Sequence, residues 1–456
     1  MGPQRARGVP SISASIVHVP YTFFPDAAGG TEVYVAELIA AMRNKNFRAV
    51  VAAPGPRNTE YDHDGIAVYR FQQDAQSKLA YAYGEPDELA AESFRALVQR
   101  LRPDIVHMHA HTAAVSERIA DIAHEFGAHV AFTYHTPTVS CLRGSMMHMG
   151  TAPCDGVLDV TRCSVCALQK HGVPAAIGNV VGRLPRHIGT SLSELGLAGR
   201  AVTALRMRQN AADAHRRFAS LMGKADCVIA VCQWVKDVLI ANGVPEGKVA
   251  LCRQGFSAGL KSPAEQAGRI ICRRAEGSLR LAYFGRIDPV KGVDLVIDAL
   301  KLIPDASVVL DIYGIVQPGS ETYASALKAS ADARVRFQPS LPRDDVSDAM
   351  AQYDFVVIPS RWLETGPLVV YEAFASGTPV LGSRLGGIGE LVSDGVDGIL
   401  VSQDDPRVWA TIIAECAANP TCIDRLRAGI KPPRTIGDAA HEMAQHYARL
   451  RATSGI

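Results

Sequence analysis

Short runs of β-branched and apolar residues alternate along most of this chain with longer segments of helical periodicity. In the first half these runs are ASIVHV, RAVVAAP, DIVHMH, HVAFTYH and CVIAV, with helical patterns from about Thr31 and near residues 86–101. Strands that alternate with helices indicate a parallel sheet with crossover helices. The pattern therefore predicts a doubly wound α/β domain that starts near Ser11.

A second series of the same kind follows a polar stretch around residues 258–278. Its expected strands are LRLAYFGR, SVVLDIYG, VRFQ, DFVVIPS, PVLGS and GILV. The chain has 456 residues, and one hydrophobic core rarely grows beyond about 250–300 residues, so two domains are expected. Two Rossmann-like domains would face each other across a cleft, where ligands bind in such folds.

The expected boundaries follow from these patterns. We predict an N-terminal domain over residues 1–257 and a C-terminal domain over residues 258–435. About ninety residues between two strands of the first domain lack the alternating pattern, which predicts a functional insertion over residues 136–225. Residues 436–456 carry Ala, Met and Tyr at helical spacing and are expected to form a helix that packs back on the N-terminal domain.

Composition excludes several classes of protein. A chain that is 48% hydrophobic and 20% charged has the composition of packed domains rather than of a disordered polymer. The formal net charge of +1 provides no global field for nucleic acid, and no nucleic-acid partner is expected. No apolar run is long enough to span a bilayer, and the first residues are too polar for a signal peptide. We expect a cytoplasmic protein whose contacts with a membrane, if it has them, are peripheral.

The segment PSRWLETGPLVVYEAF combines two carboxylates with the start of a helix. Pro367 suits the first helical position and Thr365 can cap it, so we expect a helix to begin beside Gly366. Its free N–H groups would form an anion site that the glycine lets a ligand approach closely. Glu364 precedes this helix, and Glu372 lies within it, roughly 7–8 Å of helical rise beyond Pro367. One carboxylate can therefore reach a sugar while the other reaches a ribose.

The segment AYFGRIDPVKG places Gly285, Arg286 and Lys291 on a loop at the end of a strand. The two cations can neutralise a departing diphosphate without a metal. Each of these charges, taken alone, is also compatible with an ordinary solvated loop or helix end. Their joint placement at matching strand ends favours a binding site.

In combination, ETGPLVVYEAFASGTPV with its E-x7-E pair and GRIDPVKG resemble the retaining GT-B glycosyltransferases of family 4. The resemblance covers most of the chain outside the insertion. It implies that Glu364 contacts the hydroxyls of the donor sugar and that Glu372 holds the ribose. It also implies that Arg286 and Lys291 bind the diphosphate of a nucleotide sugar, with a uridine donor favoured.

The same resemblance implies sugar and phosphate contacts from the backbone of Gly366, Pro367 and Leu368, although the proline has no amide to offer. In the first domain, Gly29 and Gly30 precede a helix, so their backbone can approach a phosphate or sugar there. Glycine-rich first loops are also common without such a role. The GGTE sequence nevertheless resembles the first-loop motif of the family, which borders the donor phosphate and the acceptor.

Histidines end two neighbouring strands of the first domain. His107, His109 and His111 would share one face of an extended chain, which allows a metal site, but packing at a strand end is the more ordinary interpretation. His135 ends the next strand, where the insertion begins. The family resemblance implies that it faces the reacting sugar, where we expect it to orient the donor and stabilise positive charge near the anomeric centre. A purely structural role is the alternative.

The insertion carries Cys141, Cys154, Cys163 and Cys166, the last two spaced as C-x2-C. This spacing is typical of a tetrahedral site with four thiolates, and such a site would be structural because no ligand position stays open. Zinc is the predicted metal, and an iron–sulfur cluster is the next candidate. Four reduced thiols or a disulfide pair are the alternatives. No cofactor is required for the chemistry.

From Ala167 to Lys224 the sequence has nine Lys or Arg and two acids, with apolar residues between them. Such a stretch fits an anionic membrane or a phosphorylated lipid acceptor, while a solvated helix face is the alternative. Its position beside His135 favours acceptor binding.

These observations predict a retaining glycosyltransferase of the hexosyltransferase class, which moves a sugar from a nucleoside diphosphate to an acceptor hydroxyl. Lipid-linked molecules and cell-surface glycan precursors are candidate acceptors, and no side chain need act as a nucleophile. The alternative is a non-catalytic protein that binds nucleotide sugars or senses metal or redox state. A phosphorylase is less favoured because the sequence has no recognisable lysine-cofactor motif.

Overall fold

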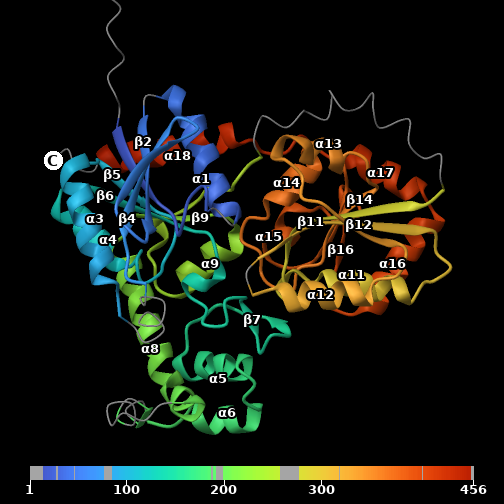
Figure 1. Ribbon diagram of the computed structural model, residues 1–456, viewed down its shortest axis with the longest axis horizontal. Coiled ribbons are helices and arrows are strands. Elements are labelled where there is room, and N and C mark those ends of the chain that lie inside the picture. Colours follow the sequence, from blue (N-terminus) through green and yellow to red (C-terminus); the bar gives the residue numbers. More distant parts are fainter. Residues whose placement is uncertain are drawn as a thin grey trace, which may run out of the picture.

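Two α/β domains lie side by side in the computed structural model (Figure 1). Each is built on a largely parallel sheet with helices on its faces, which confirms the predicted GT-B pair of doubly wound domains. The structure describes residues 14–26, 29–45, 47–75, 85–185, 188, 189, 191, 199–256, 277–317, 319–402 and 404–452.

The N-terminal sheet has the strand order β10-β9-β6-β5-β1-β2-β4-β3. Its strands are β1 (Ala14–Val19), β2 (Phe47–Gly55), β3 (Thr59–His63), β4 (Ile66–Gln72), β5 (Ile105–Met108), β6 (His129–Tyr134), β9 (Cys227–Ala230) and β10 (Val249–Leu251). The strand order reverses at β1, which pairs with β2 on one side and β5 on the other. Ligands bind at such a switch point in doubly wound sheets.

The hairpin of β3 and β4 was missed by the sequence analysis. These two strands pair antiparallel, and the turn between them is Asp64–Gly65, with φ of 51° and 74°. Positive φ at both turn residues is what a two-residue hairpin requires, and Asp-Gly is a strong signal for it. The hairpin could therefore have been found from this dipeptide. The three-residue β10 was also missed.

The C-terminal sheet has the order β13-β12-β11-β14-β15-β16, and its neighbouring strands pair parallel. Its strands are β11 (Leu279–Ile287), β12 (Val308–Val316), β13 (Val335–Gln338), β14 (Phe355–Ile358), β15 (Val380–Ser383) and β16 (Gly398–Val401). All six were predicted. The switch point lies at β11, between β12 and β14, and the loops after β11 and β14 carry the two predicted donor motifs.

The helices cover these sheets through apolar stripes. In α3, for example, Phe94 and Val98 are buried in the N-terminal core, and the Asp87 side chain caps the helix by accepting from the Ala90 amide at 2.9 Å. The N-terminal domain has α1 (Gly30–Met42), α3 (Glu88–Leu101), α4 (Glu117–Glu125) and α9 (Gln233–Ala241). The C-terminal domain has α11 (Val293–Lys301), α12 (Glu321–Ser330), α13 (Val346–Met350), α14 (Leu368–Ala375), α15 (Gly386–Leu391), α16 (Pro406–Ala418) and α17 (Thr421–Gly429).

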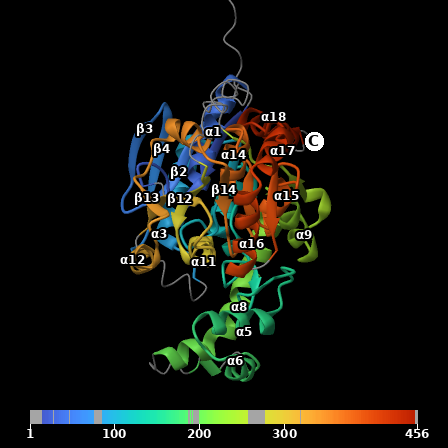
Figure 2. The same cartoon turned by 90° about the vertical axis from the view of Figure 1, so that its right-hand side faces the viewer.

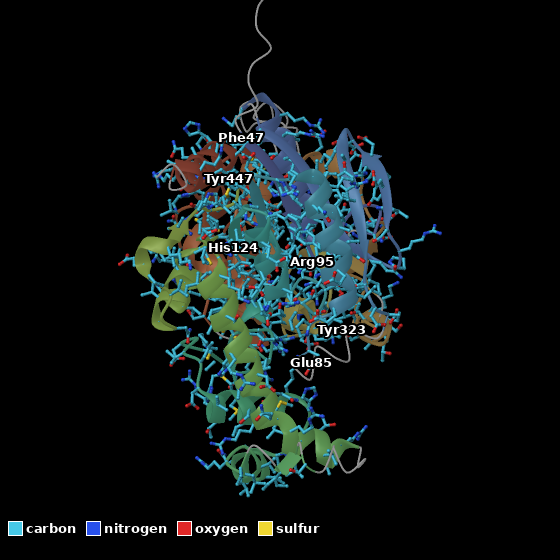
Figure 3. All side chains as sticks on the ribbon, turned by 90° about the vertical axis from the view of Figure 1, so that its left-hand side faces the viewer. Phe47, Glu85, Arg95, His124, Tyr323 and Tyr447 are labelled. Carbon is cyan, nitrogen blue, oxygen red and sulfur yellow. The ribbon has the colours of Figure 1, made fainter. Side chains whose placement is uncertain are left out.

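The terminal helix α18 (Ile436–Ala452) packs on α1, in the N-terminal domain (Figure 1). Met443 and Tyr447 share a buried cluster with Leu38 of α1. The Tyr447 ring also meets that of Phe47 edge to face, with 5.9 Å between centroids (Figure 3). The chain therefore crosses to the C-terminal domain and returns.

The insertion forms a protruding arm (Figure 2). Its elements are η2 (Pro137–Val139), β7 (Met147–His148), β8 (Ala152–Pro153), α5 (Val160–Lys170), α6 (Ala175–Val181) and α8 (Arg200–Lys224). We call α5, α6 and the N-terminal half of α8 the arm. The 25 residues of α8 span about 37 Å. Phe218 and Leu221 in its C-terminal half lie in the domain core, whereas Met207 packs on Leu168 of α5. No helix among the described ranges is both long and apolar enough to cross a bilayer.

Candidate active site

The predicted first-loop glycines lie against the predicted donor helix of the other domain. A Cβ atom added to Gly30 would be 3.5 Å from Leu368 Cδ1. Gly29 immediately precedes α1 and has no side-chain cap bond. Tertiary folding therefore brings the loop after β1 to the start of α14, although the two lie in different domains.

Lys291 and Glu364, which the sequence analysis assigned to the diphosphate and the sugar, bind each other. Glu364 is buried, and its Oε1 accepts from Lys291 Nζ at 2.6 Å and from Ser360 Oγ at 2.7 Å. Burial alone would raise the pKa of Glu364, but the charge and hydrogen bond of Lys291 outweigh it, so the pKa lies below its usual value. Lys291 Nζ also lies 4.9 Å from the centroid of the Trp362 ring. The carboxylate is therefore held ionised at the domain interface.

Arg286 lies near the end of β11, next to Gly285, whose φ of 151° favours glycine. Its Nη1 donates to Gln317 Oε1 at 3.0 Å. Its charge also acts on Glu32, a buried residue of α1, whose pKa is raised by burial and lowered in part by the Gly29 amide and by Arg286. The sequence analysis missed Glu32. The signal was an acid in the first turn of the helix that follows the glycine loop.

Glu372 lies on α14, as predicted, and is bound by a residue that the sequence analysis missed. Arg343 Nη1 donates to Glu372 Oε1 at 3.1 Å, and Arg343 Nη2 donates to Glu37 Oε1 at 2.6 Å. Glu37 belongs to α1, so Arg343 bridges the two domains. Burial lowers the pKa of Arg343, but the two carboxylates outweigh this effect and raise it. The predicted ribose ligand thus has an arginine partner in this structure.

The expected cap of the donor helix was wrong in detail. Helix α14 begins at Leu368 with Pro367 as a cap that makes no side-chain hydrogen bond. The Thr365 hydroxyl instead donates to the His135 carbonyl at 2.5 Å, because the facing domain offers this acceptor. A Cβ atom on Gly366 would lie 2.2 Å from Gln254 Oε1, so the glycine makes room for this side chain.

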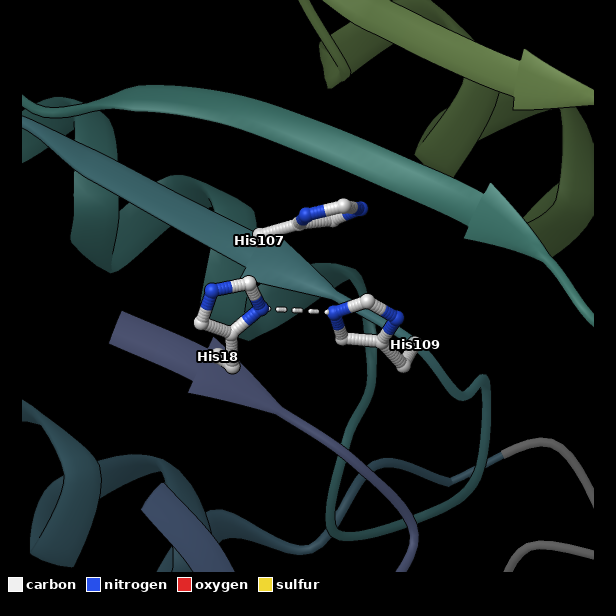
Figure 4. Close-up of side chains that lie close together, drawn as sticks. All are labelled: His18, His107 and His109. Carbon is white, nitrogen blue, oxygen red and sulfur yellow. Dashed lines mark hydrogen bonds between the residues drawn. The ribbon is translucent and has the colours of Figure 1, made fainter. Parts of the chain in front are cut away.

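His135 ends a chain of hydrogen-bonded side chains that runs into the N-terminal core. Its Nδ1 lies 3.2 Å from Gln254 Nε2, and its Nε2 lies 2.9 Å from His109 Nδ1. His109 Nε2 lies 2.9 Å from His18 Nδ1 (Figure 4). Burial lowers the pKa of both His18 and His135 to about 3, so these imidazoles are neutral. Each neutral ring has one N–H and one acceptor nitrogen. If the Gln254 amide donates to His135, then His135 donates to His109, and His109 donates to His18.

The rings of His107 and His109 lie together, with 4.0 Å between their centroids, but His111 does not join them, because β5 ends at Met108. His107 binds the hydroxyls of Tyr447 at 2.5 Å and Thr133 at 2.7 Å, whereas His111 lies 3.5 Å from a Glu117 oxygen. One ring nitrogen from each of His18, His107 and His109 lies within 4.8 Å of the other two (Figure 4). The sequence analysis missed His18 and Gln254, which bind His109 and His135. No recognisable motif surrounds either residue.

The four cysteines of the insertion are free thiols. Burial, followed by the proximity of Cys141 and Cys154, raises the pKa of Cys163 to about 11. Cys166 Sγ accepts from the Met149 amide at 3.3 Å. Within the described ranges, the one group of three metal-ligating side chains within 4.8 Å is the histidine group above.

The cysteine-bearing loop packs against the donor motif. The Leu363 amide donates to the Ser145 carbonyl at 3.0 Å, and Met146 and Leu363 share a small apolar cluster. Trp234 Nε1 donates to the Glu364 carbonyl at 2.9 Å. The insertion therefore contacts the backbone at Leu363, and α9 contacts it at the next residue.

Several cations of the basic stretch serve the insertion itself. Arg208 Nη1 donates to the carbonyls of Arg183 at 3.0 Å and Leu184 at 2.9 Å, and Arg216 pairs with Asp213. These two arginines therefore have hydrogen-bond acceptors within the insertion itself.

Comparison with protein families assigns both domains. Residues 29–255 match the model of the glycosyl transferase 4-like domain, and residues 270–431 match that of the glycosyl transferases group 1. The chain belongs to the GT-B glycosyltransferases of family 4. The arm lies within the residues that match the first of these two models.

Curated relatives of this glycosyltransferase-family chain include D-inositol 3-phosphate glycosyltransferases. The protein of Mycolicibacterium gilvum is 32% identical over 185 residues, which are 39% of this chain and 41% of that protein. The protein of Streptomyces scabiei is 27% identical over 64% of this chain and 74% of that protein. The chain spans about half or less of the length of curated relatives such as these.

Solved structures share the family fold across nearly the whole chain. Anabaena HepE in complex with UDP-glucose has a TM-score of 0.61 and 18% identity, covering 96% of this chain and all of that one. Sucrose-phosphate synthase from Thermosynechococcus elongatus has a TM-score of 0.67 and 20% identity, covering 96% of this chain and 99% of that one.

Proposed function

We propose that this protein is a retaining glycosyltransferase that moves a sugar from a nucleoside diphosphate to an acceptor hydroxyl. The observation that carries the proposal is the Lys291–Glu364 pair, at 2.6 Å, on the loops at the C-terminal switch point. The close approach of Gly30 to Leu368 places the first-domain loop beside this region. A uridine donor is supported by the named complex of HepE with UDP-glucose.

The C-terminal domain would supply the charged donor contacts. Arg286 and Lys291 would bind the diphosphate, whose negative charge grows as it departs. Gly285, Gly366, Pro367 and Leu368 would line the donor with backbone atoms. Glu364, kept ionised by Lys291, would accept hydrogen bonds from sugar hydroxyls, and Glu372 would accept them from the ribose once Arg343 releases it.

The transfer would proceed on one face of the sugar. The bond between the anomeric carbon and the phosphate oxygen breaks, and its electron pair leaves with the diphosphate. The acceptor oxygen bonds to the anomeric carbon from the same side, and its proton passes to the departing phosphate oxygen. Two carboxylates at the site are already bound by cations, Glu364 by Lys291 and Glu372 by Arg343, which favours this route over a covalent glycosyl-enzyme formed on either of them.

The N-terminal domain would supply neutral contacts. His135, held neutral by burial and oriented by His109 and Gln254, would face the sugar with its dipole rather than a full charge. The Gly29–Gly30 loop would border the donor phosphate and the acceptor. The relatives named for D-inositol 3-phosphate favour an acceptor that carries a phosphate, and lipid-linked and glycan-precursor acceptors are the others to test.

Two measurements separate this proposal from a non-catalytic nucleotide-sugar-binding or metal-sensing protein. A thermal-shift panel of UDP-, GDP- and ADP-sugars identifies the donor, since a ligand at a hundred times its dissociation constant stabilises by about 2.7 kcal/mol. We expect a UDP-sugar to shift the protein most and to be turned over with release of UDP. Binding without any release of nucleoside diphosphate, with each acceptor class present, contradicts the proposal. The anomeric configuration of the product, read by NMR, tests retention.

We infer a second property, which is carried by the C-x2-C spacing and by the electrostatic effect of Cys141 and Cys154 on Cys163. The four thiols would bind one structural zinc. Their side chains would have to move together to do so, because no three of these four sulfurs lie within 4.8 Å of one another in this structure. Elemental analysis of protein prepared without added metal should give about one zinc per chain. Visible absorption would indicate an iron–sulfur cluster, and four titratable thiols in metal-free protein would contradict any metal.

A further inference from the structure

The far end of the arm exposes an apolar helix face. Ile177 and Val180 on α6 are 55% and 65% exposed, and Val180 is the most exposed large aliphatic side chain among the described residues. Pro174, which precedes α6, is also exposed. Helical spacing of three residues places all three on one side of the helix. Figures 1 and 2 show α6 at the end of the arm, away from both sheets.

The opposite side of α6 is fixed by glycines. Gly178 is buried, and a Cβ atom added to it would lie 3.8 Å from side-chain atoms of Val165 and Leu168 of α5. A Cβ atom added to Gly182 would lie 2.6 Å from Val165. Spacing of four residues puts both glycines on the face that meets α5. The close packing therefore holds the apolar side of α6 outward.

The segment that ends α5 and forms α6 carries only positive charge. Residues 163–185 include Lys170 and Arg183 and no Asp or Glu, whereas Arg162 at the start of α5 pairs with Asp155. Lys170 and Arg183 are exposed. Lys170 donates to the Arg143 carbonyl at 3.0 Å, and Arg183 donates to the Asn179 carbonyl at 3.2 Å. These acceptors are neutral, so the two bonds do not cancel the positive charges. Exposed aliphatic residues between cations match the boundary between anionic headgroups and acyl chains.

We propose that the tip of the arm, α6 with Lys170 and Arg183, docks on an anionic phospholipid surface. Ile177 and Val180 enter the interface, and the two cations contact the lipid phosphates. Helix α8 carries this contact rigidly, because its other half is part of the N-terminal core. The inference concerns a surface outside the proposed donor site and does not depend on catalysis.

Sedimentation of the full chain with vesicles tests this. Wild-type protein should bind vesicles of phosphatidylglycerol and phosphatidylcholine, bind less as salt rises, and bind pure phosphatidylcholine weakly. The double variant Ile177→Asp/Val180→Asp should lower the partition coefficient about 10-fold to 100-fold, as should Lys170→Glu/Arg183→Glu to a smaller extent. The matched control is Leu302→Asp/Val396→Asp, since these residues are 52% and 50% exposed in the C-terminal domain.

Unchanged circular dichroism and unchanged thermal shift with UDP-sugar show that the arm variants remain folded. Equal binding by the Ile177→Asp/Val180→Asp variant and the wild type, or no binding of the wild type to anionic vesicles, overturns the proposal. A wild-type dimer that becomes monomeric in this variant, without vesicle binding by either, assigns the surface to a second copy of the chain instead.

Discussion

The C-terminal side of the domain interface carries charged side chains, whereas the N-terminal side carries a neutral hydrogen-bonded chain. Lys291 pairs with Glu364 and Arg343 pairs with Glu372 on one side. On the other side, His135 and the histidines behind it are buried, with pKa values far below the usual range. Both sides are ordered, but by different physical means.

This contrast follows from burial and from what each side would bind. A departing diphosphate needs cations, and cations persist at a half-buried interface when carboxylates pair with them. Burial disfavours the charged form of a side chain, and histidine can respond by losing its proton. A fully buried histidine is therefore neutral and needs no carboxylate partner. A neutral chain can hold a sugar in place without competing with the diphosphate for the cations. The predictions below test each half of this comparison.

The largest expected effect is on the charged side. Lys291→Ala removes a diphosphate contact and leaves Glu364 buried without its cation, so donor turnover should fall by ~10–1000-fold. Arg286→Ala should lower it within the same range. Initial rates of nucleoside diphosphate release measure both, and Lys301→Ala, an exposed lysine of the same domain that pairs with Asp298, is the control. If the Lys291 and Arg286 variants turned over the donor at the wild-type rate, the role of these two cations in catalysis would be contradicted.

The neutral side predicts a loss of stability in acid. Because the native pKa of His18 and His135 is about 3, the unfolded chain binds more protons than the native one below pH 6.5. Stability from these groups is therefore complete above about pH 7 and falls as pH drops, by about 2 kcal/mol for each histidine at pH 5. Thermal unfolding between pH 5 and 7 measures this, and His18→Asn should flatten the profile. A histidine that titrates near pH 6.5 in the NMR spectrum of the core would contradict the neutral chain.

A smaller effect is expected where the neutral chain meets the interface. Gln254→Leu removes the amide that lies 3.2 Å from His135 Nδ1, so the ring loses the partner that sets its tautomer. We expect kcat to fall about 10-fold with donor KM nearly unchanged, because orientation rather than charge is lost. Gln254→Glu should shift the pH dependence of kcat, whereas a purely structural glutamine would not. The exposed Gln445→Leu is the control. An increase in donor KM without a change in kcat would instead place Gln254 in donor binding.

The smallest effect concerns the bridge between the sides. Arg343→Ala frees Glu372 from its 3.1 Å contact and breaks the link to Glu37. If Glu372 binds ribose, donor KM should fall about 2- to 5-fold, since a competing cation is gone. Arg336→Ala, which removes a partner of Asp311 on β12, is the matched control. A rise in donor KM in the Arg343 variant would show that Arg343 itself contacts the donor.

The sequence was most informative where local rules apply. Alternating strand and helix patterns predicted both sheets, and the loops that carry Arg286 and Glu364 lie at the switch point of the second one. The hairpin around Asp64–Gly65 was predictable but overlooked. Glu32 had a local signal as well, an acid in the first turn after the glycine loop. Gln254 and Arg343 carry no comparable local signal, because their partners His135 and Glu37 lie far away in the sequence.

Sequence alone determined the two-domain architecture and the identities of the charged donor motifs, because hydrophobic period and glycine-bearing loops act over a few residues. Tertiary structure decided how these groups are paired. It joined Lys291 to Glu364, turned Thr365 from a helix cap into a partner of His135, and stacked His18 behind His109. It also turned the apolar side of α6 outward. Such pairings depend on which distant surfaces meet and how completely water is excluded there, and neither is encoded in the spacing of neighbouring residues.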